Sequence, residues 1–74
     1  MRKNKRVIWF SGVDKCEYYC IKLPAGFYRV DYTFSYSNHT TFSSRIVVND
    51  ITEAPKLLSK IFQLFSFYLT NKLN

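Results

Sequence analysis

The chain has 74 residues, of which 47% are hydrophobic and 19% aromatic, and its 11 Lys and Arg against five Asp and Glu give a formal net charge of +6. This length excludes a second domain and lies near the lower limit at which one apolar core is sufficient without a metal or a disulfide. The charge favours a polyanion or an acidic protein surface as the partner.

The first six residues form a basic segment that contains Arg2, Lys3, Lys5 and Arg6 and no acidic residue. We interpret residues 1–6 as a solvated flexible arm, with contact to phosphate or acidic lipid as the alternative. The apolar run that follows, VIWF, is shorter than the stretch of about 7–15 residues in a signal peptide. The expected location is therefore cytoplasmic.

Residues 7–74 are expected to form one domain that begins with four strands. The segments 5–12, 16–23, 27–36 and 41–48 are rich in β-branched and aromatic residues, and turn-forming residues separate them. Successive antiparallel strands joined by short links make a β-meander.

The two cysteines, Cys16 and Cys20, fall in the second predicted strand. Four residues of extended chain span about 13 Å, which is beyond the reach of a disulfide. Free thiols are therefore expected. The chain has a single histidine, His39, and no second cysteine pair, so we expect no metal and no cofactor.

The pairing of the third and fourth strands can be predicted from the apolar alternation. Placing Phe42 opposite Tyr36 puts Phe42 on the core face with Tyr32 and Phe34. This pairing leaves a three-residue loop at 38–40, a common hairpin length in which Asn can take a positive φ.

A two-residue turn at Pro24 and Ala25 is predicted between the second and third strands. It pairs Ile21 with Tyr28 and makes Tyr19 and Val30 neighbours in the core. The outward face would then carry Tyr18, Cys20, Lys22, Phe27, Arg29, Thr33, Ser35, Thr41, Ser43, Arg45 and Val47, with Asp31 near its centre.

Hydroxyls, separated arginines and one or two rings suit a surface that contacts sugar, phosphate or groove edges. The alternative is an ordinary solvated sheet face, stabilised by pairs of Ser and Thr across strands. The candidate nucleic-acid contacts are Lys3, Lys5, Arg6, Arg29, Thr33, Ser35, Ser43, Arg45 and Val47.

A helix is predicted from about residue 53 to the end, with Asp50 or Thr52 as the N-cap, Glu53 in the first turn and Pro55 early enough to be tolerated. Its apolar residues cover about half the circumference, more than the usual stripe of about 100°.

Three interpretations of this broad apolar face are open. The sheet curls around the helix as in a small barrel, or a second copy packs on the flank through Phe62, Leu69 and Leu73. In the third, the helix lies on a membrane surface with Lys56 and Lys60 at its border.

Catalysis is not expected, because His39 stands alone in a predicted turn and the acidic residues are scattered. The only glycines, Gly12 and Gly26, do not form a phosphate-binding loop.

The segments YRV (28–30), YTFSY (32–36) and APKLL (54–58), with Arg45 and Val48, resemble the small archaeal DNA-binding chromatin proteins, which are SH3-like barrels with a terminal helix. The resemblance implies a sheet lying across the minor groove of duplex DNA, with apolar side chains wedged into a base step. By this resemblance, Tyr28 and Val30 would form the wedge region. The groove contacts would be Thr33, Ser35 and Arg45, and Val47 would make an apolar contact.

We therefore predict an α+β fold, a four-stranded antiparallel β-meander followed by one C-terminal helix (ββββα), with an SH3-like half barrel as a variant. The predicted function is non-catalytic binding of nucleic acid, preferentially duplex DNA. The alternative is a protein-binding inhibitor or accessory module of viral or plasmid type, which uses the sheet edge or the apolar helix flank and includes a homodimer.

Overall fold

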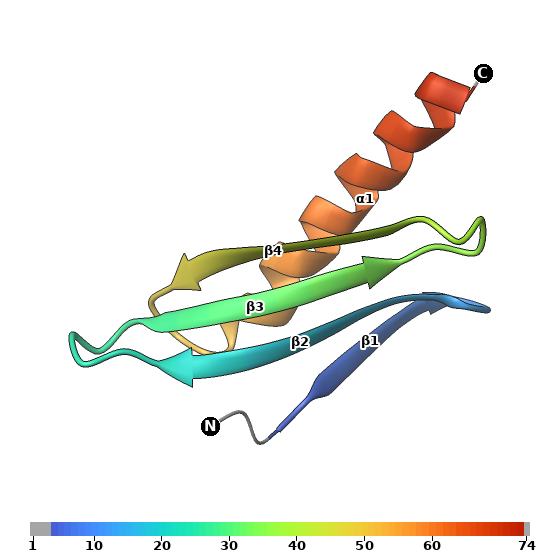
Figure 1. Ribbon diagram of the computed structural model, residues 1–74. Helices are drawn as coiled ribbons and strands as arrows, with labels where there is room; N and C mark the ends of the chain where they lie inside the picture. Colours follow the sequence, from blue (N-terminus) through green and yellow to red (C-terminus); the bar gives the residue numbers. More distant parts are fainter. Residues whose placement is uncertain (1–3, 74) are drawn as a thin grey trace.

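The computed structural model describes residues 4–73. Four strands precede one helix (Figure 1): β1 (Arg6–Ser11), β2 (Asp14–Lys22), β3 (Tyr28–Ser35), β4 (Thr41–Val48) and α1 (Glu53–Leu73). The strands form one antiparallel sheet in the order β1-β2-β3-β4. The predicted ββββα meander is confirmed, and the sheet is open, with β1 and β4 at its edges.

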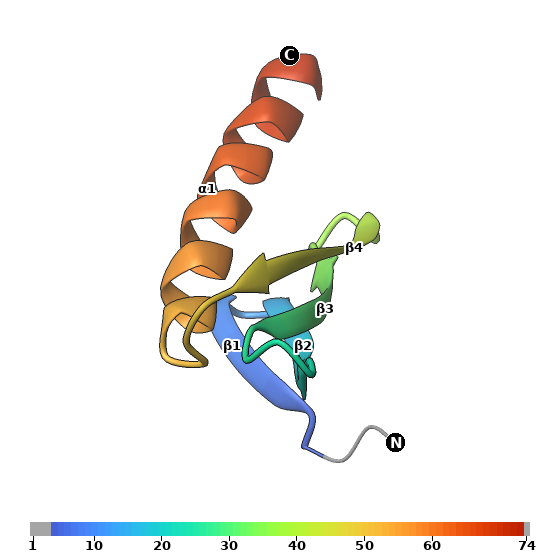
Figure 2. The same cartoon turned by 90° about the vertical axis from the view of Figure 1, so that its left-hand side faces the viewer.

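The core lies between α1 and one face of the sheet, and the C-terminal turns of α1 extend beyond the sheet (Figure 2). In β3 every second side chain is buried, as expected for a strand with one covered face. The buried core residues are Cys16, Tyr18, Val30, Tyr32, Phe34, Val48, Ala54, Leu58 and Phe62.

An aromatic cluster joins the middle of α1 to the sheet. The ring of Phe62 stacks on Phe10 with centroids 3.8 Å apart and on Tyr36 at 4.7 Å. It meets Phe34 edge-on, at 5.1 Å and 83°. Phe62 is 4% exposed. Stacked and edge-on geometries each contribute about 0.5–1.5 kcal/mol beyond the buried area, so this cluster is a main source of stability.

The pairing of β3 with β4 differs from the prediction by two residues, because Phe42 lies opposite Phe34. A shift of two keeps every side chain on its predicted face. The hairpin loop has the predicted length of three but starts one residue earlier, at 37–39, and His39 takes the positive φ of 69°. Asn38 Oδ1 accepts a hydrogen bond from the Thr40 N–H at 3.0 Å, and this Asx turn fixes the loop one residue earlier.

The pairing of β2 with β3 differs by one residue, since Cys20 lies opposite Val30. The connecting loop contains three residues, 24–26, and the Leu23 N–H donates to the Phe27 carbonyl at 2.8 Å. Its last residue, Gly26, has a φ of +100°, the left-handed conformation that a three-residue hairpin loop needs there.

A one-residue slip reverses both faces of a strand, so the predicted facing of β2 is wrong. Tyr18, Cys20 and Lys22 lie on the α1 side, whereas Tyr19 and Ile21 point away from it.

The N-cap of α1 is Asp50, which is one of the two predicted candidates; the other candidate, Thr52, does not cap the helix. Asp50 Oδ1 accepts a hydrogen bond from the Thr52 N–H at 3.1 Å. Glu53 Oε1 accepts from the N–H groups of Asn49 and Asp50 at 3.1 and 3.3 Å. This reciprocal arrangement is a capping box. Among residues 4–73, no helix combines the length and apolarity that crossing a membrane requires.

Both cysteines are free thiols. Cys16 is fully buried, and burial, together with the neighbouring charge of Glu17, raises its pKa to about 12. Burial also raises the pKa of Cys20, against a smaller opposing effect of Arg6. Burial therefore favours the protonated form of both thiols.

Candidate nucleic-acid interface

We call the sheet surface that faces away from α1 the open face (Figure 2). Its membership follows from the strand register and from the alternation of side chains along each strand. The residues are Val7, Trp9, Lys15, Glu17, Tyr19, Ile21, Arg29, Asp31, Thr33, Ser35, Thr41, Ser43, Arg45 and Val47.

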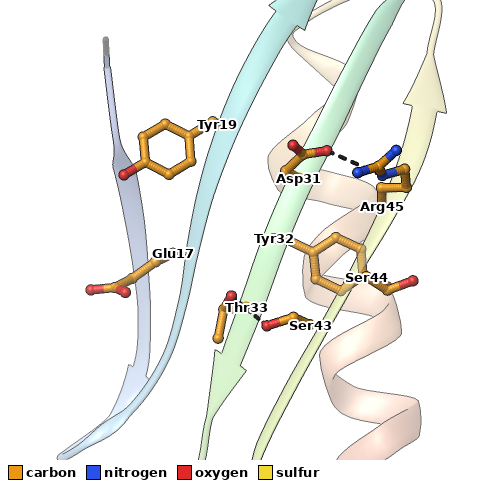
Figure 3. Close-up of a pocket in the computed structure, with 8 residues that line it drawn as sticks. All are labelled: Glu17, Tyr19, Asp31, Tyr32, Thr33, Ser43, Ser44 and Arg45. Atoms are coloured by element: carbon orange, nitrogen blue, oxygen red, sulfur yellow. Dashed lines mark hydrogen bonds and ion pairs between the residues drawn. The ribbon is translucent and has the colours of Figure 1, made fainter. Parts of the chain in front are cut away.

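A shallow hollow of about 460 Å³ lies over β2, β3 and β4 (Figure 3). Side chains from all three strands reach it, and α1 runs behind the sheet in this view. The lining residues are Glu17, Tyr19, Asp31, Tyr32, Thr33, Ser43, Ser44 and Arg45. The hollow is therefore formed mainly by the open face.

Two arginines flank Asp31 at one end of the hollow. Arg29 Nε lies 3.1 Å from Asp31 Oδ1, a second Arg29 nitrogen donates to Oδ2 at 3.2 Å, and Arg45 Nε lies 3.6 Å from Oδ1. The Asp31 side chain is only 12% exposed, but that of Arg45 is 64% exposed. Because a guanidinium has five N–H donors, Arg45 can hold Asp31 and still donate to an anion from solvent.

Two lysines flank Glu17 in the same way. Its Oε2 lies 3.2 Å from Lys15 Nζ and 3.4 Å from Lys5 Nζ. The hydrogen bond from Lys15, followed by the charges of Lys15 and Lys5, lowers the pKa of Glu17. Each carboxylate of the open face is thus shared by two cations, which leaves an excess of positive charge on this surface.

Hydroxyl groups lie next to the arginine pair. Thr33 Oγ1 and Ser43 Oγ are 2.7 Å apart, and Ser35 and Thr41 oppose one another two residues further along. These pairs stabilise the sheet. Each hydroxyl can also donate a hydrogen bond to a bound molecule or accept one from it.

An exposed aromatic ring stands on β1 beside the lysine pair. Trp9 is 60% exposed, and Lys15 Nζ lies 5.2 Å from the centroid of its ring. Tyr19 lines the hollow on β2, and Figure 3 shows its ring between β2 and β1. The predicted face lacked Tyr19, Lys15 and Glu17, and the sequence left Trp9 unplaced because VIWF is apolar on both sides. A usable signal existed, because polar Lys15 and Glu17 alternate with Cys16 and Tyr18.

The structure brings together six of the predicted contacts on the open face: Arg29, Thr33, Ser35, Ser43, Arg45 and Val47. Lys5 adjoins them through Glu17. Arg6 belongs to β1 and alternates to the α1 side, where it is a hydrogen-bond partner of Tyr18. Lys3 lies outside the described residues.

The wedge region implied by the resemblance is not on this surface. Val30 is fully buried, and Tyr28 packs against the core on the α1 side.

Of the three partner contacts predicted on the helix, Phe62 needs correction. Phe62 is buried within the aromatic cluster and is not available to a partner. Leu69 is half-buried and lines a small hollow with Tyr36 and Ser66. The side chain of Leu73 lies outside the described part of the chain.

Within residues 4–73, no group of three or more His, Cys, Asp or Glu side chains is arranged to hold a metal ion. No protein-family model, curated protein or solved structure matches this chain.

Proposed function

We propose that the chain is a non-catalytic protein that binds nucleic acid through the open face. The observation that carries this proposal is that four cations, two rows of hydroxyls and an exposed indole share one uncovered surface. Phosphate contacts supply most of the affinity of such surfaces, and hydroxyls and rings contact sugar and base.

Of the four cations that flank Glu17 and Asp31, the two most exposed are Arg45 and Lys5, and these two are well separated across the sheet. Continuing the register places Lys5 opposite Tyr19, in one row with Asp31 and Arg45. Three strand spacings separate the ends of this row, about 14 Å. Arg45 and Lys5 can therefore hold phosphates at two different points of one backbone.

The position of the aromatic residues favours an unpaired strand over the duplex that the sequence suggested. A duplex binder of the wedge type needs apolar side chains that enter a base step, and Tyr28 and Val30 point toward α1 instead. Trp9 offers a flat exposed ring beside a lysine. Stacking of one base on such a ring contributes about 1–3 kcal/mol.

The proposal can be tested by titrating the chain with a single-stranded oligonucleotide and with the corresponding duplex. Trp9 is the single tryptophan of the chain, so its fluorescence reports directly on the open face. We expect quenching that is stronger with the single strand. Each phosphate contact contributes about −0.7 to the slope of log K against log salt, so four cations give at most about −2.8.

Two results would contradict the proposal. One is the absence of binding to either form at low salt. The other is binding that leaves the Trp9 fluorescence unchanged and does not weaken as salt is added.

A second candidate function is a protein-binding accessory module or inhibitor. It is favoured by the edge strand β4, where residues 41–45 are exposed, and by the apolar side chains that α1 leaves in solvent. This function predicts that Leu64→Lys abolishes partner capture, whereas Arg45→Ala has little effect. Nucleic-acid binding predicts the reverse.

A further inference from the structure

The helix α1 carries a second apolar surface beside the one that packs on the sheet. Leu57, Leu64, Phe67 and Tyr68 are 38%, 71%, 68% and 53% exposed. We call these four residues the α1 stripe. Isolated exposed apolar residues are ordinary, but four large ones within 12 residues of one helix make a contiguous patch of the kind that marks an interaction site.

The α1 stripe continues onto the edge of the sheet. Tyr68 stacks on Phe65 with centroids 6.2 Å apart, and Phe65 contacts Phe42 of β4 at 4.7 Å. Phe42 is itself 38% exposed. The patch therefore runs from the helix to β4 without a polar interruption along this line of rings.

The spacing of the α1 stripe suits a second α-helix. Three residues of the stripe, Leu57, Leu64 and Tyr68, form a row with half-buried Ile61, which is not part of the stripe, at intervals of four, three and four residues. This is the alternation of a helix that packs along another helix. A second copy of the chain presents the same row, so the surface can pair with itself about a two-fold axis.

The patch, when it is buried completely in both copies, reaches the lower size limit for a dimer. A fully buried aromatic side chain removes about 150–250 Å² from solvent, so Phe67 and Tyr68 at their exposures offer roughly 100–150 Å² each. With Leu57, Leu64 and Phe42 the patch exposes on the order of 500 Å². Two copies would bury about 1,000 Å², the lower limit for a specific interface.

We propose that two copies of the chain associate through the α1 stripe, helix against helix. The interface lies on the α1 side of the sheet, so the dimer leaves both open faces uncovered. This inference does not depend on the proposed nucleic-acid binding, because it uses a different surface.

The test is the mass of the full chain in solution, measured by light scattering after size exclusion as concentration rises. We expect a concentration-dependent shift from 8.8 kDa to twice that mass. Each copy carries +6, so salt should strengthen this association by screening the repulsion, the opposite of its effect on nucleic-acid binding. Leu64→Glu should raise the dissociation constant at least about tenfold.

Gln63→Glu is the matched control, because it adds the same charge at the neighbouring exposed position and should leave the dimer intact. Circular dichroism of both variants checks that the fold is retained. A mass of 8.8 kDa at the highest concentration overturns the proposal, as does equal weakening by both variants. Binding of a monomer to anionic phospholipid vesicles that Leu64→Glu abolishes would also overturn it, in favour of a membrane surface.

Discussion

Phe62→Ala is expected to destabilise the fold strongly, although the sequence suggested that Phe62 contacts a partner. The substitution removes a ring that is 4% exposed and makes three close ring contacts, with Phe10, Tyr36 and Phe34. Removal of a buried Phe side chain costs about 3–5 kcal/mol. The whole domain is expected to have roughly 4–11 kcal/mol of stability, so much of the total would be lost.

Urea denaturation followed by circular dichroism measures this loss. Phe67→Ala is the matched control, because Phe67 lies five residues further along the same helix and is 68% exposed. Its effect on the free energy of unfolding should be within about 0.5 kcal/mol when the protein is dilute and monomeric. Equal effects of the two substitutions would refute the assignment of Phe62 to the core.

Three further predictions follow from single contacts. Gly26→Ala should cost about 1–2 kcal/mol in urea denaturation because Gly26 has a φ of +100°, whereas Gly12→Ala should be nearly neutral; comparable costs would argue against the three-residue loop. The pKa of Glu17 is lowered in the folded state, so its contribution to stability is present above the unfolded pKa and is lost as pH falls through the folded pKa. Glu17→Gln should therefore flatten the dependence of stability on pH in the acidic range, and an unchanged profile would contradict the ion pairs. The Cys16 thiol, whose pKa burial raises to about 12, should react with an alkylating reagent in denaturant but hardly at all in the native protein at neutral pH; rapid native alkylation located at Cys16 by peptide mapping would be inconsistent with its burial.

The parts of the fold that were predicted correctly have strong local signals. In β3 the alternation of Val30, Tyr32 and Phe34 with polar residues defines one buried face. The cap of α1 follows from Asp50 and Glu53, whose side chains bond to nearby backbone groups. Such short-range interactions are encoded in a few neighbouring residues.

The facing of β2 was not predicted because it depends on the length of one turn. With Pro24 and Ala25 alone in the turn, Tyr19 falls in the core, but the left-handed conformation of Gly26 adds a third loop residue and reverses the strand. The candidate site changed accordingly, since Glu17 and Tyr19 moved onto the open face. Trp9 lies on the open face as well, because it pairs with Lys15 of β2.

The broad apolar face of α1 was recognised, but its division required the structure. Leu58 and Phe62 pack on the sheet, whereas Leu64 and Phe67 remain in solvent. At 100° per residue Phe67 falls on the side of the helix opposite Leu58, whereas Leu64 falls within the predicted apolar half, and the periodicity does not say which part of that half contacts the sheet. The packing of α1 on the sheet separates the core from the α1 stripe.

Binding through the open face is tested by comparing the affinities of Arg45→Ala and Lys56→Ala for a single-stranded oligonucleotide at low salt. Each variant loses one positive charge from an exposed residue, but Arg45 lies on the open face and Lys56 on α1. Binding through the open face predicts that Arg45→Ala weakens the affinity several-fold and reduces the salt slope by about 0.7, while Lys56→Ala matches the wild type. Equal losses in the two variants would contradict binding through the open face.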